Sequence, residues 1–238
     1  CELYRDDARH DIVVLDKRFV PERVANLPNH MRFVQADIRN TKLMSHLLRD
    51  IDLLYLLAAE VEAEKSIHKE RAVWDHNFEA PKGLIESCPS SVRIIFPSTG
   101  NVFGGVDESE KFMDLTEEDE PQPKYPYAET KCAMEKFLLR SDRNFVIVRF
   151  GTNHGYAPGI RFNLVTNLFV HRAMVGEDLT VHGAGENYRP TVCTKDCARA
   201  LDFLSTRPEA TGEIFHVVCE NFMIKDLAKK VVSLFNTG

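Results

Sequence analysis

The chain runs Val92-Arg93-Ile94-Ile95-Phe96-Pro97-Ser98-Thr99, and a later segment begins Tyr127-Ala128-Glu129-Thr130-Lys131. The first segment opens with a short apolar run typical of a buried strand, and the second opens a stretch with helical spacing. Tyr127 and Lys131 are four residues apart, so they lie on one face of that helix. An ammonium group there can hold the pKa of the phenol below its usual value of about 10, through attraction between unlike charges.

A hydroxyl side chain at the end of the preceding strand completes a group suited to proton transfer. Ser98 or Thr99 can share with Tyr127 the hydrogen bond to a substrate oxygen. Such a group removes or returns a hydroxyl proton while a hydride moves to or from a nicotinamide. A tyrosine and a lysine at this spacing are common by chance, so the order of the surrounding features decides how much the pattern means.

Short apolar runs alternate with longer amphipathic stretches over most of the chain. We expect strands at residues 11–16, 31–37, 51–59, 92–96, 144–149 and 213–218, and helices at residues 41–49, 71–88, 127–140 and 195–205. Asn40 and Thr41 suit the N-cap of the first helix. Strands separated by helices predict an α/β fold with a doubly wound parallel sheet, covered by helices on both faces.

The pattern becomes irregular after Gly155. Pro158-Gly159 opens a loop, residues 162–175 predict a helix, residues 179–181 predict a short strand, and a turn-rich link with Gly183, Gly185 and Asn187 leads to Arg189. We therefore expect a dinucleotide-binding domain at residues 1–155 and a smaller, mainly substrate-binding lobe at residues 156–238. Within the lobe, residues 195–218 are expected to pack back on the first domain.

The composition is that of a globular protein large enough to bury a core, with 238 residues of which 44% are hydrophobic and 28% charged. The formal net charge is −6 and the positive residues are scattered, so nucleic acid is not an expected partner. We expect neither a membrane span nor a secretory leader. The six cysteines form no Cys-x-x-Cys pair and lack partners at metal-ligand spacing, which indicates free thiols in a reducing cytoplasm and no metal site.

The start of the chain bears on cofactor binding. Residue 1 is Cys1, and the segment Glu2-Leu3-Tyr4-Arg5 is typical of the end of a helix, so we expect the natural start to lie upstream. A glycine-rich phosphate turn of the type Gly-x-x-Gly-x-x-Gly is absent from the sequence, and it would precede this helix. Either the turn belongs to upstream residues, which we favour, or the chain cannot grip a dinucleotide in the usual way.

Residues that follow the first three predicted strands are candidates for contact with an adenine dinucleotide. Asp16 can accept hydrogen bonds from ribose hydroxyls and would repel a 2′-phosphate, which favours NAD over NADP. An aspartate there is more often a turn former. Asp37 and Ile38 could meet the adenine by hydrogen bonding and packing. Ala58 and Ala59 are small enough for a pyrophosphate to approach the backbone, although helix–strand packing explains them equally well.

Taken in order, these features resemble the extended short-chain dehydrogenase/reductase family, within it the NAD-dependent nucleotide-sugar epimerases and dehydratases. The matching motifs are V-V-L-D-K-R ending at Arg18, Q-A-D-I-R around Asp37, L-L-A-A ending at Ala59, Asn77 in a helix, F-P-S-T-G-N-V-F-G ending at Gly104, Y-A-E-T-K from Tyr127, V-R-F-G-T-N-H-G ending at Gly155, N-Y-R-P around Arg189 and T-K-D-C-A-R-A ending at Ala200. The resemblance covers nearly the whole chain. It implies a Rossmann-like fold and a homodimer that pairs helices 71–88 and 127–140 of two subunits.

The resemblance also implies a role for each matched position. Tyr127 would be the acid/base residue, Lys131 its pKa partner and a ligand of the nicotinamide ribose, and Thr99 the hydroxyl that assists at the sugar oxygen. The residues that would line the NAD site are Asp16, Asp37, Ile38, Ala58, Ala59, Tyr127 and Lys131. The residues that would contact the nucleotide-diphosphate sugar are Thr99, Asn101, Arg161, Asn167 and Arg189, and arginine forks suit phosphate oxygens. Asn77 would have a structural role as much as a contact role.

Two departures from the family pattern limit which reactions the sequence predicts. Family dehydratases place acidic residues directly after the catalytic Thr, whereas this chain has Gly100-Asn101, which cannot transfer a proton as a carboxylate does. Thr152 and His154 stand where many members carry a substrate-contacting Asn and a Tyr; for His154 we expect packing rather than proton transfer. We therefore expect an NAD-dependent 4-epimerase. The alternatives are a one-way reductase or dehydrogenase and, less favoured, an inactive cofactor-binding regulator.

Overall fold

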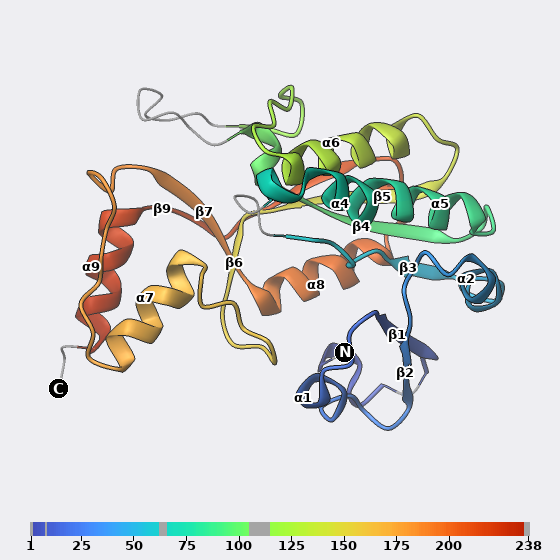
Figure 1. Ribbon diagram of the computed structural model, residues 1–238, viewed down its shortest axis with the longest axis horizontal. Helices are drawn as coiled ribbons and strands as arrows, with labels where there is room; N and C mark the ends of the chain where they lie inside the picture. The colour runs from blue at the N-terminus through green and yellow to red at the C-terminus, as the bar shows by residue number, and fades with distance from the viewer. Residues whose placement is uncertain (1, 8, 62–65, 105–114, 236–238) are drawn as a thin grey trace.

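A four-stranded parallel sheet in the order β3-β4-β5-β8 forms the centre of the computed structural model, which describes residues 2–7, 9–61, 66–104 and 115–235 (Figure 1). Its strands are β3 (Leu53–Tyr55), β4 (Arg93–Thr99), β5 (Asn144–Phe150) and β8 (Ile214–Val217). Ser98 lies opposite Arg149, and Thr99 opposite Phe150. Thr99 therefore ends its strand at the carboxyl edge of the sheet, the edge at which α/β folds bind ligands.

The crossover from β3 to β4 is not the single helix that the sequence predicts. It contains a 3₁₀-helix (Ile67–Lys69), α4 (Glu70–Trp74), a π-helical segment (Asp75–Glu79) and α5 (Ala80–Ser87). The amide of Ala80 donates to the carbonyl of Asp75, five residues back. Pro81 follows and has no N–H for the α-helical bond to Asn77, so the wider turn agrees with the sequence at this point.

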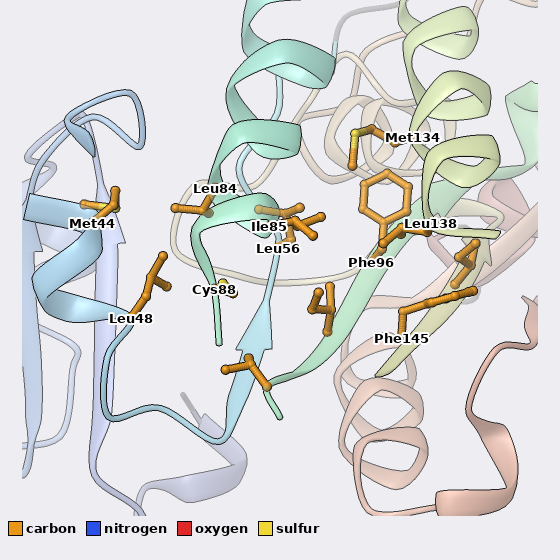
Figure 2. Packing of buried hydrophobic residues seen from close by; sticks show 13 residues of the cluster. Met44, Leu48, Leu56, Leu84, Ile85, Cys88, Phe96, Met134, Leu138 and Phe145 are labelled. Atoms are coloured by element: carbon orange, nitrogen blue, oxygen red, sulfur yellow. The ribbon is translucent and has the colours of Figure 1, made fainter. Parts of the chain in front are cut away.

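The largest core cluster lies between this crossover, the sheet and two further helices, α2 (Thr41–Leu47) and α6 (Pro126–Leu139). Figure 2 shows Met44 and Leu48 pointing toward Leu84, with Phe96 of β4 beside Met134 of α6. A second cluster on the other face joins Ile95 and Val148 to α8 (Thr194–Ser205). Neighbouring residues of β4 thus enter different clusters, as expected of a strand buried on both faces.

The amino-terminal strands form a sheet of their own. β1 (Ile12–Asp16) and β2 (Met31–Gln35) pair in parallel, which confirms both predicted strands but leaves them apart from the central sheet. The short segments around them are a 3₁₀-helix (Glu2–Tyr4) and α1 (Pro21–Val24). The predicted cap of α2 is confirmed, since Oδ1 of Asn40 accepts from the amide of Leu43 at 3.2 Å.

The carboxy-terminal lobe contains a three-stranded mixed sheet and two packed helices (Figure 1). Its strands are β6 (Thr152–His154), β7 (Tyr188–Cys193) and β9 (Glu220–Met223), and its helices are α7 (Val165–Met174) and α9 (Ile224–Phe235). β6 pairs with β7 in parallel, and β9 pairs with β7 antiparallel. Along the chain, α8 and a 3₁₀-helix (Pro208–Ala210) lie between β7 of the lobe and β8 of the central sheet.

Two details of the lobe differ from the sequence prediction. The expected strand at residues 179–181 is wrong: Leu179 and Val181 pack against the cluster around Phe169 and Leu227, and the segment is not a strand. Leu179 and Val181 pack against α7 and α9 there, and among the described residues the segment has no neighbouring strand to pair with. Arg189, which was expected after the turn-rich link and in no strand, lies in β7, opposite Phe222.

The described residues bear on the predictions about cysteines, metal sites and membrane spans. Cys88, Cys132, Cys193, Cys197 and Cys219 are free thiols, while Cys1 lies outside the described residues. Over that same part of the chain, no cluster of three or more His, Cys, Asp or Glu side chains could hold a metal ion. No described helix combines the length and the apolar character needed to cross a membrane.

Candidate active site

The end of β4 and the first turns of α6 bring Thr99, Tyr127 and Lys131 together. All three side chains are buried, with relative exposures of 9%, 8% and 5%. Helix α6 begins at Pro126, whose missing N–H is no loss in the first turn of a helix. The hydroxyl of Thr99 lies beside that of Tyr127 and acts to lower its pKa. The predicted group of three residues is thus a compact, dehydrated cluster.

The charge that acts on Tyr127 differs from the expectation. Burial raises the pKa of Tyr127, and the hydrogen bond with Thr99 and the positive charge of Arg161 partly oppose this. Lys131 is not among the groups that shift this pKa. Its ammonium donates to the carbonyl of Pro97 at 2.7 Å and lies 4.6 Å from the ring centre of Phe96. The predicted lowering of the phenol pKa by Lys131 is therefore wrong for the protein alone.

Lys131 is itself strongly perturbed. Burial lowers its pKa to about 8, and the carboxylate of Glu135, one turn further along α6, opposes that change. An ammonium has three N–H donors, and Lys131 uses one of them on Pro97 within the described part of the chain. Burial thus brings the pKa of this group to about 8, and the ammonium keeps donors for a ligand.

Arg161 and Asn167 meet through a loop that faces the cluster. Oδ1 of Asn167 accepts from the amide of Gly155 at 3.0 Å, and its Nδ2 donates to the carbonyl of Arg161 at 3.1 Å. The buried Asn167 amide thus ties both ends of the segment 155–161. Its bonds among the described residues are structural, and they fix the backbone that carries Arg161.

The remaining substrate candidates are exposed. Asn101 lies in the 3₁₀-helix Gly100–Phe103, and its amide donates to Oγ1 of Thr99 at 3.2 Å. Arg189 is exposed on β7, and its side chain makes no ion pair or hydrogen bond with the described residues. His154 is half-buried in β6, where burial lowers its pKa. Asn101 thus touches the cluster through Thr99, whereas no described hydrogen bond or ion pair joins the side chains of Arg189 and His154 to it.

The cofactor candidates lie at two strand ends that an ion pair joins. Asp16 ends β1 and accepts from the amide of Arg18 at 2.9 Å, as a turn former does. Ala58 is exposed and Ala59 half-buried after β3. Lys17 and Glu60 form an ion pair of 3.1 Å, which the sequence did not predict and which connects the two ends. This arrangement leaves an accessible edge of small and acidic residues.

Asp37 and Ile38, predicted to contact the adenine, make more contacts within the protein than expected. Arg39 grips Asp37 with a bond of 2.7 Å, and its hydrogen bonds lower the pKa of that carboxyl to about 2. The same guanidinium reaches Asp75 at 2.7 Å. Ile38 packs on the large core cluster and lines a cavity of about 240 Å³ between α2 and α5. A larger cavity of about 630 Å³, lined by residues 68–72 and 75, contains none of the predicted site residues.

Asn77 has the structural role that its position suggests. It is buried in the π-helical segment, and its Oδ1 accepts from the amide of Glu60 at 2.7 Å. Its Nδ2 donates to the carbonyl of Glu60 at 3.0 Å and to Oγ1 of Thr130 at 3.3 Å. The side chain thus links the segment after β3 to α6, next to the Tyr127 cluster.

A family model and several known proteins match this chain. Residues 1–218 match the model of the NAD dependent epimerase/dehydratase family. The chain is 29% identical to the trifunctional UDP-glucose 4,6-dehydratase/UDP-4-keto-6-deoxy-D-glucose 3,5-epimerase/UDP-4-keto-L-rhamnose-reductase RHM1 of Arabidopsis thaliana, over 98% of this chain and 37% of that protein. It is 31% identical to a UDP-glucose 4-epimerase of Lactobacillus helveticus, over 56% of this chain and 40% of that protein. The chain thus spans well under half of each relative.

A solved structure shares the fold. The dTDP-glucose 4,6-dehydratase DesIV of Streptomyces venezuelae, determined with NAD bound, superposes with a TM-score of 0.81 at 25% identity. The match covers 96% of this chain and 73% of that one. The sheet and the helices around the Tyr127 cluster therefore have the arrangement of a known NAD-binding protein.

Proposed function

This chain belongs to the NAD dependent epimerase/dehydratase family, and from that premise we propose that it is a nucleotide-sugar 4-epimerase. The observation that carries the proposal is the buried cluster of Thr99, Tyr127 and Lys131. In the sequence, Gly100-Asn101 follows Thr99 directly. The cluster suits proton transfer at a sugar hydroxyl. The two residues after Thr99 offer no carboxylic acid for the removal of water, which distinguishes this site from the dehydratase pattern.

The residues present fit the two riboses of NAD, the cofactor of the family. Asp16 uses only Oδ1 among the described residues, on the amide of Arg18, so its second oxygen suits a ribose hydroxyl. Lys131 has donors beyond its bond to Pro97, which suit the ribose next to the nicotinamide. Exposed Ala58 allows close approach along the edge between them. The sequence contains no glycine-rich turn for the pyrophosphate.

Bound NAD would supply a hydride acceptor, and then a hydride donor, at the sugar carbon. Tyr127 holds the hydroxyl proton during this exchange, and the hydroxyl of Thr99 beside it orients the sugar oxygen. Burial opposes ionisation of Tyr127, so nearby cations are needed to make the phenolate accessible. Arg161 supplies one such charge in the protein alone, whereas Lys131, one helical turn away, does not shift this pKa there.

The lobe is proposed to hold the nucleotide diphosphate. Arg161 and Arg189 offer guanidinium forks that match phosphate oxygens, and Arg189 is exposed with no partner of its own among the described residues. Asn101 and Asn167 complete the set. Asn167 acts chiefly through the loop that it ties, because its described hydrogen bonds are to Gly155 and Arg161. We also propose that the protein is a cytoplasmic homodimer.

A product analysis tests the proposal against its rivals. The protein is incubated with NAD and, in turn, UDP-glucose, dTDP-glucose, UDP-N-acetylglucosamine and UDP-glucuronic acid, and the sugar products are identified by NMR while NADH is followed by absorbance. A 4-epimerase yields the C4 epimer with no net NADH. A 4-keto-6-deoxy product would mean a dehydratase, stoichiometric NADH change would mean a one-way dehydrogenase or reductase, and bound NAD with no product would mean a regulator.

A further inference from the structure

Three residues on one face of α6 each contact the end of β4. They are spaced four residues apart, so they stack along the buried side of the helix. The three contacts are Tyr127 with Thr99, Lys131 with the carbonyl of Pro97, and Glu135 with Ser98. The proposed function uses the first two. The third is a buried carboxylate with no place in the reaction.

Glu135 is paired with an arginine from the sheet. Nη2 of Arg149 lies 2.7 Å from Oε2 of Glu135, and Nε lies 3.1 Å from Oε1. Both side chains are only 3% exposed. Arg149 lies directly opposite Ser98 in the register of β4 and β5. The ion pair therefore ties α6 to two neighbouring strands within one turn of Lys131.

The far side of Arg149 contacts the turn that follows Thr99. Its guanidinium carbon lies 5.1 Å from the ring centre of Phe103, and Nη1 lies 3.4 Å from Nε2 of His216 and 3.5 Å from the carbonyl of Glu117. The ring of Phe103 packs edge-on against His216. The pair thus connects α6, β4, β5 and β8 around the strand end that carries Thr99.

We propose that Glu135, fixed by Arg149, is a positioning residue that seats the Lys131 ammonium against the end of β4. This role goes beyond the proposed function and rests on it only for the use of Lys131 in catalysis. A burial-only role is the alternative, in which the ion pair stabilises the core and has no effect on Lys131. The two are distinguished by a property of Lys131 itself.

The groups that face Lys131 explain why Glu135 affects it. Its neighbours along α6 are Tyr127 and Glu135, β4 contributes the carbonyl of Pro97 and the ring of Phe96, and Arg149 of β5 acts through its pairing with Glu135. Among these, the carboxylate of Glu135 is the group that raises the pKa of Lys131 against the effect of burial. Loss of that charge favours the neutral amine.

The experiment measures the titration of Lys131 by NMR in protein carrying isotope-labelled lysine, without substrate or cofactor. The Lys131 resonance is identified by its loss in Lys131→Arg. The wild type is expected to titrate near pH 8. In Glu135→Gln, which keeps the shape but not the charge, the midpoint should fall by about half a pH unit or more. Glu135→Asp, which keeps the charge, should bring the Lys131 midpoint most of the way back to the wild-type value.

Two further variants separate positioning from stability. Val231→Ala removes a buried side chain of α9 in the other lobe, so it should lower the melting temperature while the Lys131 midpoint stays unchanged. If Glu135→Gln does not fold, the double variant Glu135→Leu/Arg149→Met removes both charges and leaves none buried alone. It should fold and show the lower midpoint. The proposal is overturned if the variant that folds, Glu135→Gln or the double variant, titrates Lys131 at the wild-type midpoint. This holds whatever the product analysis finds.

Discussion

Burial and charge act in opposite directions on the hydroxyl of Tyr127. The sequence predicted the tyrosine, its lysine and its threonine because their spacing is local to one helix and one strand end. It did not predict that Lys131 would bond to Pro97 or that Arg161 would supply the charge felt by the phenol. Those contacts join residues 34 positions apart in the chain or more, so side-chain placement in the fold decides them, which no local pattern encodes.

Removal of the Arg161 charge should make the phenolate harder to form. Because a cation lowers the pKa of a nearby phenol, Arg161→Gln should move the acidic limb of the pH profile of kcat/KM to higher pH. Arg189→Gln is the matched control: it should raise KM and leave the limb in place. An unmoved limb in Arg161→Gln would mean that the charge is not felt in catalysis.

The buried Lys131 should make stability depend on pH in a defined window. Its pKa is about 8 in the folded protein and about 10.4 when unfolded, so the unfolded chain binds more protons between these values. Stability therefore rises with pH through this window, by about 3 kcal/mol from this group. The free energy of unfolding of wild type minus that of Lys131→Met, from urea denaturation, should show the rise, because other titrations cancel. A flat difference would contradict it.

At the scale of elements, six of the seven predicted strands were found because parallel strands read as apolar runs, and the one expected at residues 179–181 was not. β3 is much shorter than its run, since the chain leaves the sheet after Leu56, whose amide still donates to the carbonyl of Ile95, for the exposed segment with Leu57 and Ala58. β7, β9 and α9 were not predicted. β7 contains Pro190 and alternates exposed with buried residues only in part, so its pairing with β9 depends on the lobe around it.

The π-helical segment gives an element-scale prediction. Asn77→Ala removes both partners of the backbone of Glu60 and should cost roughly 1–3 kcal/mol, because these polar groups are partly buried. Asn40→Ala, which deletes one exposed helix cap, is the control and should cost about 1 kcal/mol. Denaturant unfolding measures both. A loss for Asn77→Ala no greater than that for Asn40→Ala would show that the clamp on Glu60 is unimportant.

At the scale of the molecule, alternation of strands and helices predicted the fold class, and the family match agrees with it. Local patterns could not show that β1 and β2 form a separate sheet, or that Lys17 and Glu60 join its end to that of β3. Both are long-range arrangements. The carboxy-terminal lobe was predicted as a region, but its sheet was not, because its strands are short and pair across distant segments.

The dimer is also a prediction at this scale. If helices α4–α5 and α6 of two subunits pair, light scattering after gel filtration should give twice the chain mass of 27.1 kDa. A mass of one chain over the whole concentration range would contradict it, without bearing on the chemistry of the Tyr127 cluster.

The most direct test of the account is the replacement of Tyr127 by phenylalanine, which removes one hydroxyl from the buried cluster. Tyr156→Phe, which removes a hydroxyl from a tyrosine that is 86% exposed, is the matched control. With the best substrate of the product analysis, Tyr127→Phe should bind NAD as the wild type does, while formation of the C4 epimer falls by about 10²-fold or more. Tyr156→Phe should keep its rate. Undiminished epimer formation by Tyr127→Phe would contradict the central claim that this hydroxyl carries the proton.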